Sequence, residues 1–270
     1  MMSSTKQNYS EITDVSHVGS IVLLFGGTGN RLFQMARAWD LKNMGHCPKV
    51  LDIEECPELF WFVNTVLRWV RHPAWLNTKD VCKLMGLERA EPSCRNRLKI
   101  YCTLIKFLFC NKKDQLNIPL KKDNRPVQIG YFQAHNCISK KSVNAVATAI
   151  SNKLKIKQSI RTDAVVHIRG GDFALEDRLS QDQVFQFMKS QHKTICVTND
   201  VEYVRQNYPD LEISSSSDAS DDFIILAQAA FILPSNSTFC FWACAIATLN
   251  QHATILSKPS ADYWNLLIDY

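Results

Sequence analysis

The stretch that decides the fold is Ile21-Val22-Leu23-Leu24-Phe25-Gly26-Gly27-Thr28-Gly29-Asn30. Five apolar residues in succession are typical of a strand that is buried on both faces of a sheet. The glycines that follow allow a tight turn, and apolar residues at helical spacing then continue until Gly45. Because residues 49–53 also read as a strand, the sequence predicts a strand, a helix and a parallel strand at its beginning.

The same alternation returns in the last third of the chain. Apolar, strand-like segments alternate with helical patterns, which is typical of α/β proteins with parallel sheets. The strands are predicted at 127–132, 164–168, 194–197, 211–213, 231–233 and 253–256, and the helices at 144–154, 200–207, 222–229 and 238–248. We therefore predict a disordered tail over 1–19 and two Rossmann-like halves, over 20–138 and 139–270. Ligands of such sheets bind at the carboxyl ends of the strands, between the halves.

Composition narrows the class of protein. Hydrophobic residues make up 46% of the 270 residues and charged residues 21%, which is typical of a globular protein and excludes a disordered one. No run of about 18 uncharged apolar residues occurs, so we expect no membrane-spanning helix. The ten cysteines form no CxxC pair and follow no secretory signal, so we expect free thiols in a reducing compartment.

Positive charge is concentrated in the middle of the chain. Residues 68–125 contain fourteen Lys and Arg against five Asp and Glu, a net +9, so the remainder carries 17 basic and 21 acidic residues, a net −4. We expect this segment to form a basic helical insert. Such charge is suited to binding phosphates, nucleic acid or an anionic membrane. Alternatively, the segment is simply a helical surface exposed to water. The segment has no recognisable nucleic-acid-binding motif.

Three segments carry candidate functional residues. The loop 26–30 can bring backbone N–H groups to an anionic ligand, or it is simply a tight turn. The segment 167–172 ends a predicted strand and places His167 and Arg169 on one side of it, where a guanidinium suits phosphate. Asp222 and the loop 234–239 supply a carboxylate and hydroxyls, although Ser237 or Thr238 could merely cap the next helix.

These segments together resemble the family 11 glycosyltransferases, which are α-1,2-fucosyltransferases. The family pattern Gly-Gly-Leu-Gly-Asn-Gln-Met/Leu-Phe-Gln-Tyr-Ala is similar to residues 26–36, and His-Ile-Arg-Arg-Gly-Asp-Tyr is similar to residues 167–173. Residues 130–133, 198–200 and 236–243 are similar to three further family elements. The elements follow one another in the family's order from residue 21 to about 256.

The resemblance implies a GT-B fold, with an acceptor-side first half and a donor-side second half. It implies GDP-β-L-fucose as donor, inversion at the anomeric carbon, and no required metal or cofactor. The catalytic candidates are Arg169, which would neutralise the departing diphosphate, with His167 and Asp172. The implied donor-binding residues are Asp222, Asn236, Ser237, Thr238, Gly27, Gly29, Asn30 and Arg31, and the implied acceptor-side residues are Gln133 and His135.

The chain departs from the family pattern at three positions. Gly170 replaces the second arginine of the usual pair, and Arg31 replaces a glutamine, so we hypothesise that Arg31 compensates from across the cleft. His135 stands where the family often has a glutamate. The sequence identifies no general base for the acceptor hydroxyl.

The leading hypothesis is a cytoplasmic fucosyltransferase that builds a surface polysaccharide, an O-antigen unit of lipopolysaccharide. Its acceptor would be a galactose-type sugar on a lipid-linked carrier, and its basic middle would hold it at the inner face of the plasma membrane. We expect no nucleic-acid partner. Two alternatives stay open: an NAD(P)-binding Rossmann oxidoreductase, based on the glycine loop, and a non-catalytic nucleotide-sugar-binding relative, based on Gly170.

Overall fold

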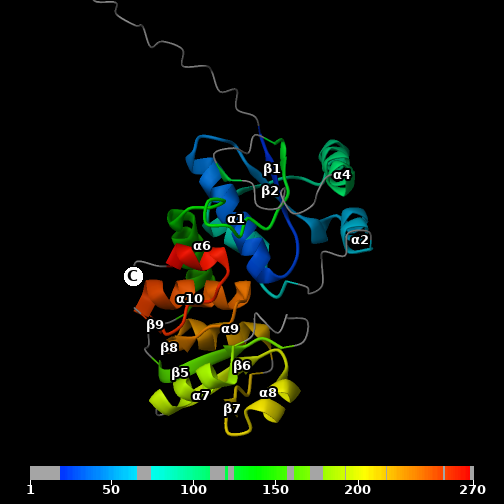
Figure 1. The fold of residues 1–270 in the computed structure, drawn as a ribbon. Coiled ribbons are helices and arrows are strands. Elements are labelled where there is room, and N and C mark those ends of the chain that lie inside the picture. Colours follow the sequence, from blue (N-terminus) through cyan, green and yellow to red (C-terminus); the bar gives the residue numbers. More distant parts are fainter. Residues whose placement is uncertain are drawn as a thin grey trace, which may run out of the picture.

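The computed structural model describes residues 19–65, 74–109, 119–120, 125–156, 161–170, 179–191, 193–216, 218–251 and 253–267. Two sheets lie at opposite ends of the molecule with a layer of helices between them (Figure 1). The first sheet has the strand order β3-β2-β1-β4 and the second β7-β6-β5-β8-β9, and every described pair is parallel. This confirms the predicted α/β class and its two parallel halves.

The first sheet consists of β1 (Ile21–Leu24), β2 (Lys49–Asp52), β3 (Glu88–Arg89) and β4 (Val127–Gln128). The second consists of β5 (Arg161–Ile168), β6 (Thr194–Thr198), β7 (Glu212–Ile213), β8 (Ala229–Leu233) and β9 (Thr254–Ile255). The helices are α1 (Thr28–Asn43), α2 (Pro57–Thr65), α3 (Thr78–Leu84), α4 (Cys94–Phe109), α6 (Lys140–Leu154), α7 (Gln181–Ser190), α8 (Val201–Asn207), α9 (Ala219–Ala227) and α10 (Thr238–Gln251), with short 3-10 helices η1 (Ile53–Glu55) and η4 (Asp262–Leu267).

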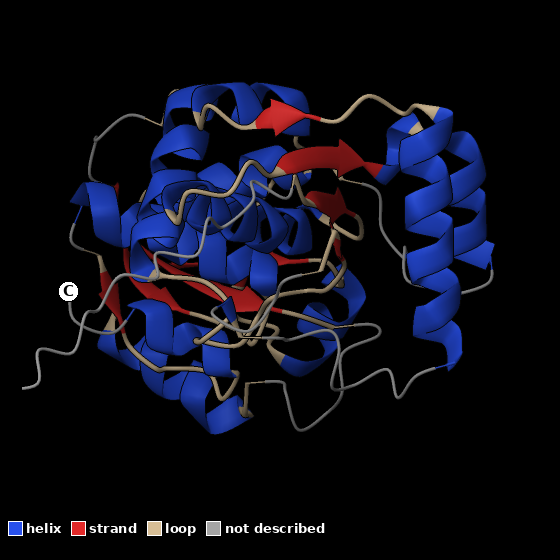
Figure 2. Ribbon diagram, turned by 90° about the horizontal axis from the view of Figure 1, so that it is seen from above, coloured by secondary structure: helices blue, strands red, loops and turns tan. Residues whose placement is uncertain are grey.

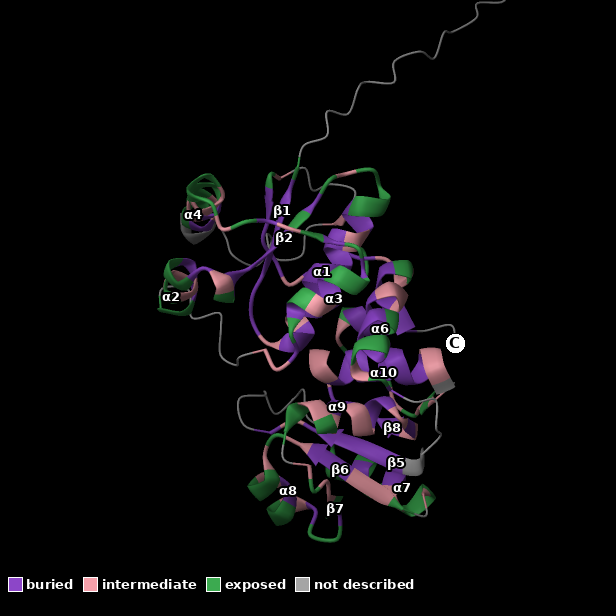
Figure 3. Cartoon of the chain, turned by 180° about the vertical axis from the view of Figure 1, so that it is seen from behind, coloured by how far each residue is buried: buried purple, intermediate pink, exposed green. Residues whose placement is uncertain are grey.

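The strand β1 is buried on both faces, as its continuous apolar sequence requires. Ile21 and Leu23 face α2 and α4, whereas Val22 and Leu24 face the helices between the sheets. The second sheet is covered in the same way, by α9 and α10 on its inner face and by α7 and α8 on its outer face (Figure 1). The view from above shows the same stacking of helices and strands (Figure 2). The exposed residues therefore gather on the outer helices, and the buried ones gather on the strands and on the central helices (Figure 3).

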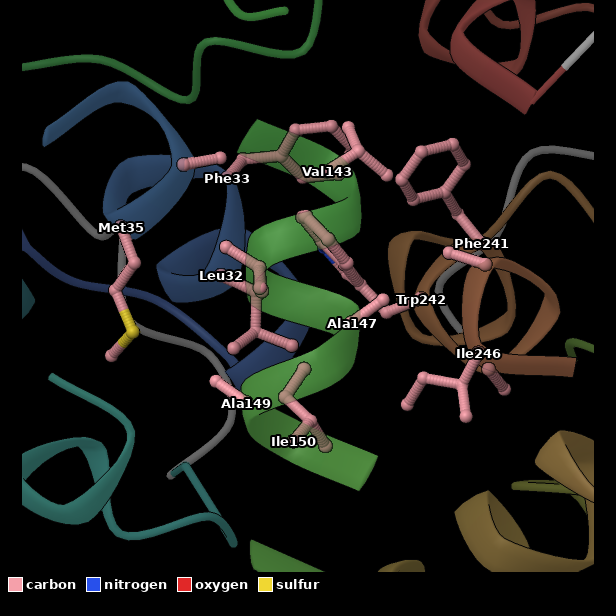
Figure 4. Close-up of a cluster of buried hydrophobic side chains, with 14 of the residues drawn as sticks. Leu32, Phe33, Met35, Val143, Ala147, Ala149, Ile150, Phe241, Trp242 and Ile246 are labelled. Atoms are coloured by element: carbon pink, nitrogen blue, oxygen red, sulfur yellow. The ribbon is translucent and has the colours of Figure 1, made fainter. Parts of the chain in front are cut away.

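A single hydrophobic cluster joins the central helices of both halves. Leu32 and Phe33 of α1, Ala147 and Ile150 of α6, and Trp242 of α10 belong to it, and all are buried (Figure 4). The ring of Phe33 stacks on Phe241, with 5.1 Å between centroids. Since α1 belongs to the first half and α10 to the second, this shared core packs the two halves against each other.

Gly29 permits the closest approach between the halves. A Cβ atom at Gly29 would lie 2.5 Å from Oγ1 and 2.8 Å from Cβ of Thr238, so α1 and α10 could not meet as they do with a larger residue there. The Trp242 indole donates a hydrogen bond to the Gly29 carbonyl oxygen at 3.0 Å. The N-termini of these two helices are thereby fixed side by side.

Most predicted elements are confirmed, two differ clearly from the structure in extent, and one helix is missing from the prediction. The strand predicted over 127–132 ends at Gln128, and Phe132 has a φ of 52°, which no strand accommodates. The helix predicted over 222–229 begins at Ala219, because Asp218 accepts hydrogen bonds from the backbone of Ser220 and Asp221, and position 229 already belongs to β8. The helix α7 was not predicted.

Some further predictions can be compared with the structure only over the residues that it describes. The tail predicted over 1–19 lies outside the described residues except for Gly19, as do residues 68–73, 110–118 and 121–124 of the basic insert. The described part of that insert contains α3 and α4, so it is largely helical, as predicted. Nine cysteines are described, and all are free thiols, as expected. Over the described ranges, no helix is long and apolar enough to cross a bilayer.

Candidate functional site

A cavity of about 490 Å³ lies between the halves, at the carboxyl ends of β5 and β6. We call it the main cavity. The first half contributes the start of α1 and one residue ahead of α3, and the second half contributes strand ends and the starts of α9 and α10. Its lining residues are Gly27, Thr28, Gly29, Asn30, Trp75, His167, Arg169, Val197, Thr198, Asn199, Ser216, Asp218, Ala219, Asp222, Ser237, Thr238 and Phe239. The predicted arrangement of two Rossmann-like halves facing a cleft, which defines the GT-B-like class, is thus present.

His167 and Arg169 reach the main cavity from the end of β5, the central strand of the second sheet. Their spacing of two residues puts both on the same side of the strand. His167 is buried, its Nδ1 lies 2.6 Å from the Ser235 hydroxyl, and its ring stacks on Phe239. Arg169 is half-buried at the cavity wall. The strand therefore presents a fixed imidazole and a guanidinium to the same space.

The structure explains why position 170 is a glycine. Its backbone N–H donates to Asn199 Oδ1 at 3.1 Å, which holds it beside the end of β6. A Cβ atom at Gly170 would lie 2.5 Å from the Cβ of Asp200, whose carboxylate caps α8 by accepting from Tyr203 N–H. An arginine at position 170 therefore does not fit unless Asp200 moves.

Asp222 lies in the first turn of α9 and lines the main cavity. Burial raises the pKa of its carboxyl, and the hydroxyl of Ser216, which donates to Oδ1, partly opposes that shift, as does the nearby His167. A half-buried carboxylate facing a cavity can accept hydrogen bonds from a ligand's N–H or O–H groups.

Three helices begin at the main cavity. The starts of α1, α9 and α10 all contribute lining residues, including Thr28, Ala219 and Thr238. The first N–H groups of a helix have no partner within the helix and carry partial positive charge. At α9 the backbone N–H groups of Ser220 and Asp221 already donate to Asp218, whereas the starts of α1 and α10, together with the Arg169 guanidinium, make this cavity a favourable site for a polyanion such as a diphosphate.

Arg31 does not line the main cavity. Its guanidinium is 1% exposed and lies within the first half, where Nη1 donates to both carboxylate oxygens of Asp52 at 2.8 and 2.7 Å. Nε donates to the Gly26 carbonyl oxygen at 2.9 Å, and Nη2 forms an ion pair with Glu54. The structure therefore does not bring Arg31 together with Arg169, as compensation for Gly170 from across the cleft would require.

Three other predicted residues lie outside the main cavity lining. Gln133 donates to Asn30 Oδ1 at 2.8 Å, so it helps to hold the side chain of a lining residue. Asn236 Oδ1 accepts from the Ala261 backbone. His135 is exposed and pairs with Asp262, with 2.7 Å between Nδ1 and Oδ2. The predicted catalytic residue Asp172 lies outside the described residues.

A second cavity, of about 350 Å³, lies at the carboxyl end of β2. Most of its lining is polar, and it consists of Arg31, Asp52, Glu54, Glu55, Ala74, Trp75, Leu76, Asn77, Thr78 and Lys79. Thr78 donates to Asp52 Oδ2 at 2.6 Å, so this carboxylate is fully engaged, whereas Glu54 is partly exposed. Trp75 is a lining residue of both cavities.

Sequence reasoning missed Trp75. Its backbone N–H donates to Thr28 Oγ1 at 3.1 Å, and its indole contacts the rings of Phe223 and Phe239 in the second half. It lies in a segment that the sequence marked only by its positive charge, and no local pattern distinguishes it from a core aromatic. Only the meeting of the two halves makes it a lining residue.

Two buried cysteines, Cys240 and Cys244, lie one turn apart on α10, and Cys240 is a neighbour of His167. Burial alone raises the pKa of a thiol, but a hydrogen bond from Cys244 and the neighbouring His167 lower that of Cys240, while that of Cys244 is raised. In the part of the chain that the structure describes, no group of three or more His, Cys, Asp or Glu could hold a metal ion.

Comparison with known proteins finds only distant likenesses. No protein-family model matches the sequence, and neither does any curated protein. Among solved structures, POFUT1 in complex with GDP aligns with a TM-score of 0.37 and 11% identity over 86% of this chain and 97% of that one. POFUT1 in complex with GDP-fucose gives 0.39 and 15% over 89% and 96%, and the E. coli heptosyltransferase WaaC with ADP gives 0.40 and 9% over 84% of each chain. Likenesses this remote transfer no substrate or activity to this chain.

Proposed function

We propose that the protein is an inverting glycosyltransferase that uses GDP-β-L-fucose and forms an α-1,2 linkage to a galactose-type acceptor. The observation that carries this proposal is the convergence of Arg169, His167 and the N-termini of α1 and α10 on one cavity between the halves. The motif order along the sequence supports the same assignment. The donor would bind in the main cavity without a required metal.

The chemistry of the main cavity suits a nucleoside diphosphate. The diphosphate would lie against Arg169 and the hydroxyls of Ser237 and Thr238, at the start of α10. The carboxylate of Asp222 would accept hydrogen bonds from the base or the ribose. The cavity volume of about 490 Å³ lies within the range of ordinary small-molecule sites.

In the reaction, the acceptor oxygen forms a bond to the anomeric carbon while the bond from that carbon to the diphosphate oxygen breaks. Negative charge grows on the departing GDP, so a guanidinium already in place stabilises the transition state more than the ground state. Arg169 would supply this stabilisation. The proton of the acceptor hydroxyl passes to a base on the acceptor side or to water.

The acceptor would enter through the second cavity. Gln133 and His135, which the sequence suggested for this role, lie outside both cavity linings, whereas Trp75 borders both cavities. Glu54, whose partly exposed carboxylate lines that cavity and pairs with Arg31, is our candidate for the base. A mixed lining of carboxylates, cations and an aromatic ring suits a neutral, hydroxyl-rich ligand such as a sugar.

The proposal includes a setting for the enzyme. The acceptor would be a sugar on a lipid-linked carrier, and the product would be part of an O-antigen in lipopolysaccharide. The protein would work in the cytoplasm at the inner face of the plasma membrane. These statements rest on the sequence resemblance and on the basic middle of the chain.

Ligand-dependent melting tests the donor. GDP and GDP-fucose should raise the melting temperature of the full chain, whereas NAD(P) should not, because stabilisation by a ligand follows its affinity for the folded state. Stabilisation by NAD(P) alone would favour the oxidoreductase alternative. Stabilisation by GDP-fucose without GDP release, across a panel of β-galactosides, would favour the non-catalytic relative.

The Arg169→Ala variant tests the site. We expect a loss of GDP release of about a hundredfold or more, which is typical when one preorganised charge stabiliser is removed. Arg205→Ala is the matched control, because Arg205 is exposed on α8 and does not line the main cavity. Full turnover in Arg169→Ala would refute the assignment.

A further inference from the structure

The outermost layer of the first half is a pair of helices, which we call the outer ridge: α2 (Pro57–Thr65) and α4 (Cys94–Phe109). They lie side by side, away from the central helices (Figures 1 and 2). Glu58 and Arg97 form an ion pair at 3.2 Å, and the rings of Phe62 and Tyr101 contact each other with 5.7 Å between centroids. The two helices thus present one joint outer surface.

Large apolar side chains are exposed on the outer ridge. Leu98 is 64% exposed, Ile105 45% and Trp61 62%. Leu98 and Ile105 are seven residues apart, so they lie on the same face of α4, opposite the buried Ile100 and Leu104 that hold the helix on the sheet. The inward apolar stripe packs on the core of the first half, whereas the exposed Leu98 and Ile105 belong to no hydrophobic cluster among the residues that the structure describes.

Positive charge lies along one side of the outward stripe. Arg95, Lys99 and Lys106 are exposed on α4, and the whole helix contains no Asp or Glu. A helix with apolar side chains flanked by Lys and Arg is suited to lie in the interface of an anionic bilayer, with its apolar groups among the lipids. A tryptophan at the edge of such a surface is also typical of membrane interfaces.

We infer that the outer ridge docks onto an anionic lipid membrane. The inference deepens the proposed function, because a lipid-linked acceptor is delivered at such a surface. The place of the ridge in the fold agrees with that role: Glu55 lines the second cavity, and α2 begins at Pro57, two residues further along. An acceptor rising from the bilayer would therefore meet the second cavity beside the ridge.

Vesicle sedimentation of the full chain at low salt tests the inference. We expect binding to vesicles of phosphatidylcholine and phosphatidylglycerol in equal parts, much weaker binding to phosphatidylcholine alone, and release by added salt. Lys99→Gln with Lys106→Gln should weaken partitioning about fivefold for each charge, the equivalent of about 1 kcal/mol per basic residue. Leu98→Ser with Ile105→Ser should remove the remaining, salt-resistant part of the binding.

Matched substitutions elsewhere provide the controls. Lys155→Gln with Lys189→Gln removes two exposed charges from the second half, and Val201→Ser with Leu256→Ser removes two exposed apolar side chains there. Both controls should bind vesicles as the wild type does. Each variant is compared by its thermal melt, and the single variant Leu98→Ser replaces the double variant if the latter is less stable.

Several results would overturn the inference. Equal binding to neutral and anionic vesicles would do so, as would equal losses in the control variants. A wild-type dimer in light scattering that Leu98→Ser with Ile105→Ser dissociates would mean that a second copy of the chain covers the ridge. GDP binding is measured on the same preparations: vesicle binding without GDP binding would refute the proposed function and leave the outer ridge as a membrane surface.

Discussion

The variant Arg31→Gln tests whether Arg31 stabilises the first half, as its contacts indicate, or binds the donor from across the cleft, as the sequence suggested. The side chain is 1% exposed and makes hydrogen bonds through Nε and both terminal nitrogens, two of them to Asp52, whose side chain is 7% exposed. Glutamine is shorter and uncharged, so it leaves the carboxylate of Asp52 buried without its cation. Removing one partner of a buried ion pair typically costs about 3–5 kcal/mol.

That loss is a large share of the roughly 5–15 kcal/mol that stabilises an ordinary domain. With an unfolding slope of about 3 kcal/mol per molar urea, the midpoint of Arg31→Gln should fall by about 1 M or more. Adding Asp52→Asn removes the stranded charge, so the double variant should lose less stability than the two single variants together. The coupling energy expected for such contacting residues is about 0.5–3 kcal/mol.

The affinity for GDP is the second measurement, and it can refute the structural role of Arg31. Because Arg31 lines the second cavity and not the main cavity, GDP affinity measured by calorimetry below the melting range should stay close to that of the wild type. If Arg31→Gln instead kept the wild-type urea midpoint and weakened GDP binding tenfold or so, about 1.4 kcal/mol, the guanidinium would act on the donor and our interpretation would be refuted.

Three further substitutions test other parts of the site. Gly170→Arg should lower stability by about 1–3 kcal/mol in urea unfolding, because its Cβ meets Asp200, and should not tighten GDP binding; tighter binding at full stability would contradict this. Asp222→Asn should melt at a higher temperature than the wild type at neutral pH and should bind GDP less well. Burial raises the pKa of the Asp222 carboxyl, so its ionisation destabilises the fold as pH rises. The gain in melting temperature of the variant should therefore shrink on acidification. An advantage that grows in acid would be the opposite of our expectation. Gly29→Ala should cost about 1–3 kcal/mol in urea unfolding through its clash with Thr238; an unchanged midpoint would mean that the helices separate freely.

The sequence predicted much of the main cavity because parallel sheets place the ends of their strands predictably. His167 and Arg169 follow a recognisable strand, and alternation alone puts them on one side of it. Gly27, Asn30 and Thr238 begin helices after glycine or serine loops, where ligands of α/β folds commonly bind. All five line the cavity in the structure.

Other residues could not be placed from the sequence, because their roles depend on contacts between distant segments. Arg31 follows the glycine loop as directly as Asn30 does, yet its side chain turns back to Asp52, 21 residues later. Trp75 lines two cavities and contacts the rings of Phe223 and Phe239 because the other half packs against it.

The sequence by itself determined the alternation of strands and helices, the two parallel sheets and the strand ends that face a ligand. These features follow from local patterns of apolar residues and glycines, which act over a few residues of chain. Only the tertiary structure decided which side chains share a cavity, why position 170 must be glycine, and that α4 exposes a second apolar stripe beside its basic one. Those outcomes depend on how α1 and α10 pack and on which face of each helix a sheet covers, and no local pattern contains that information.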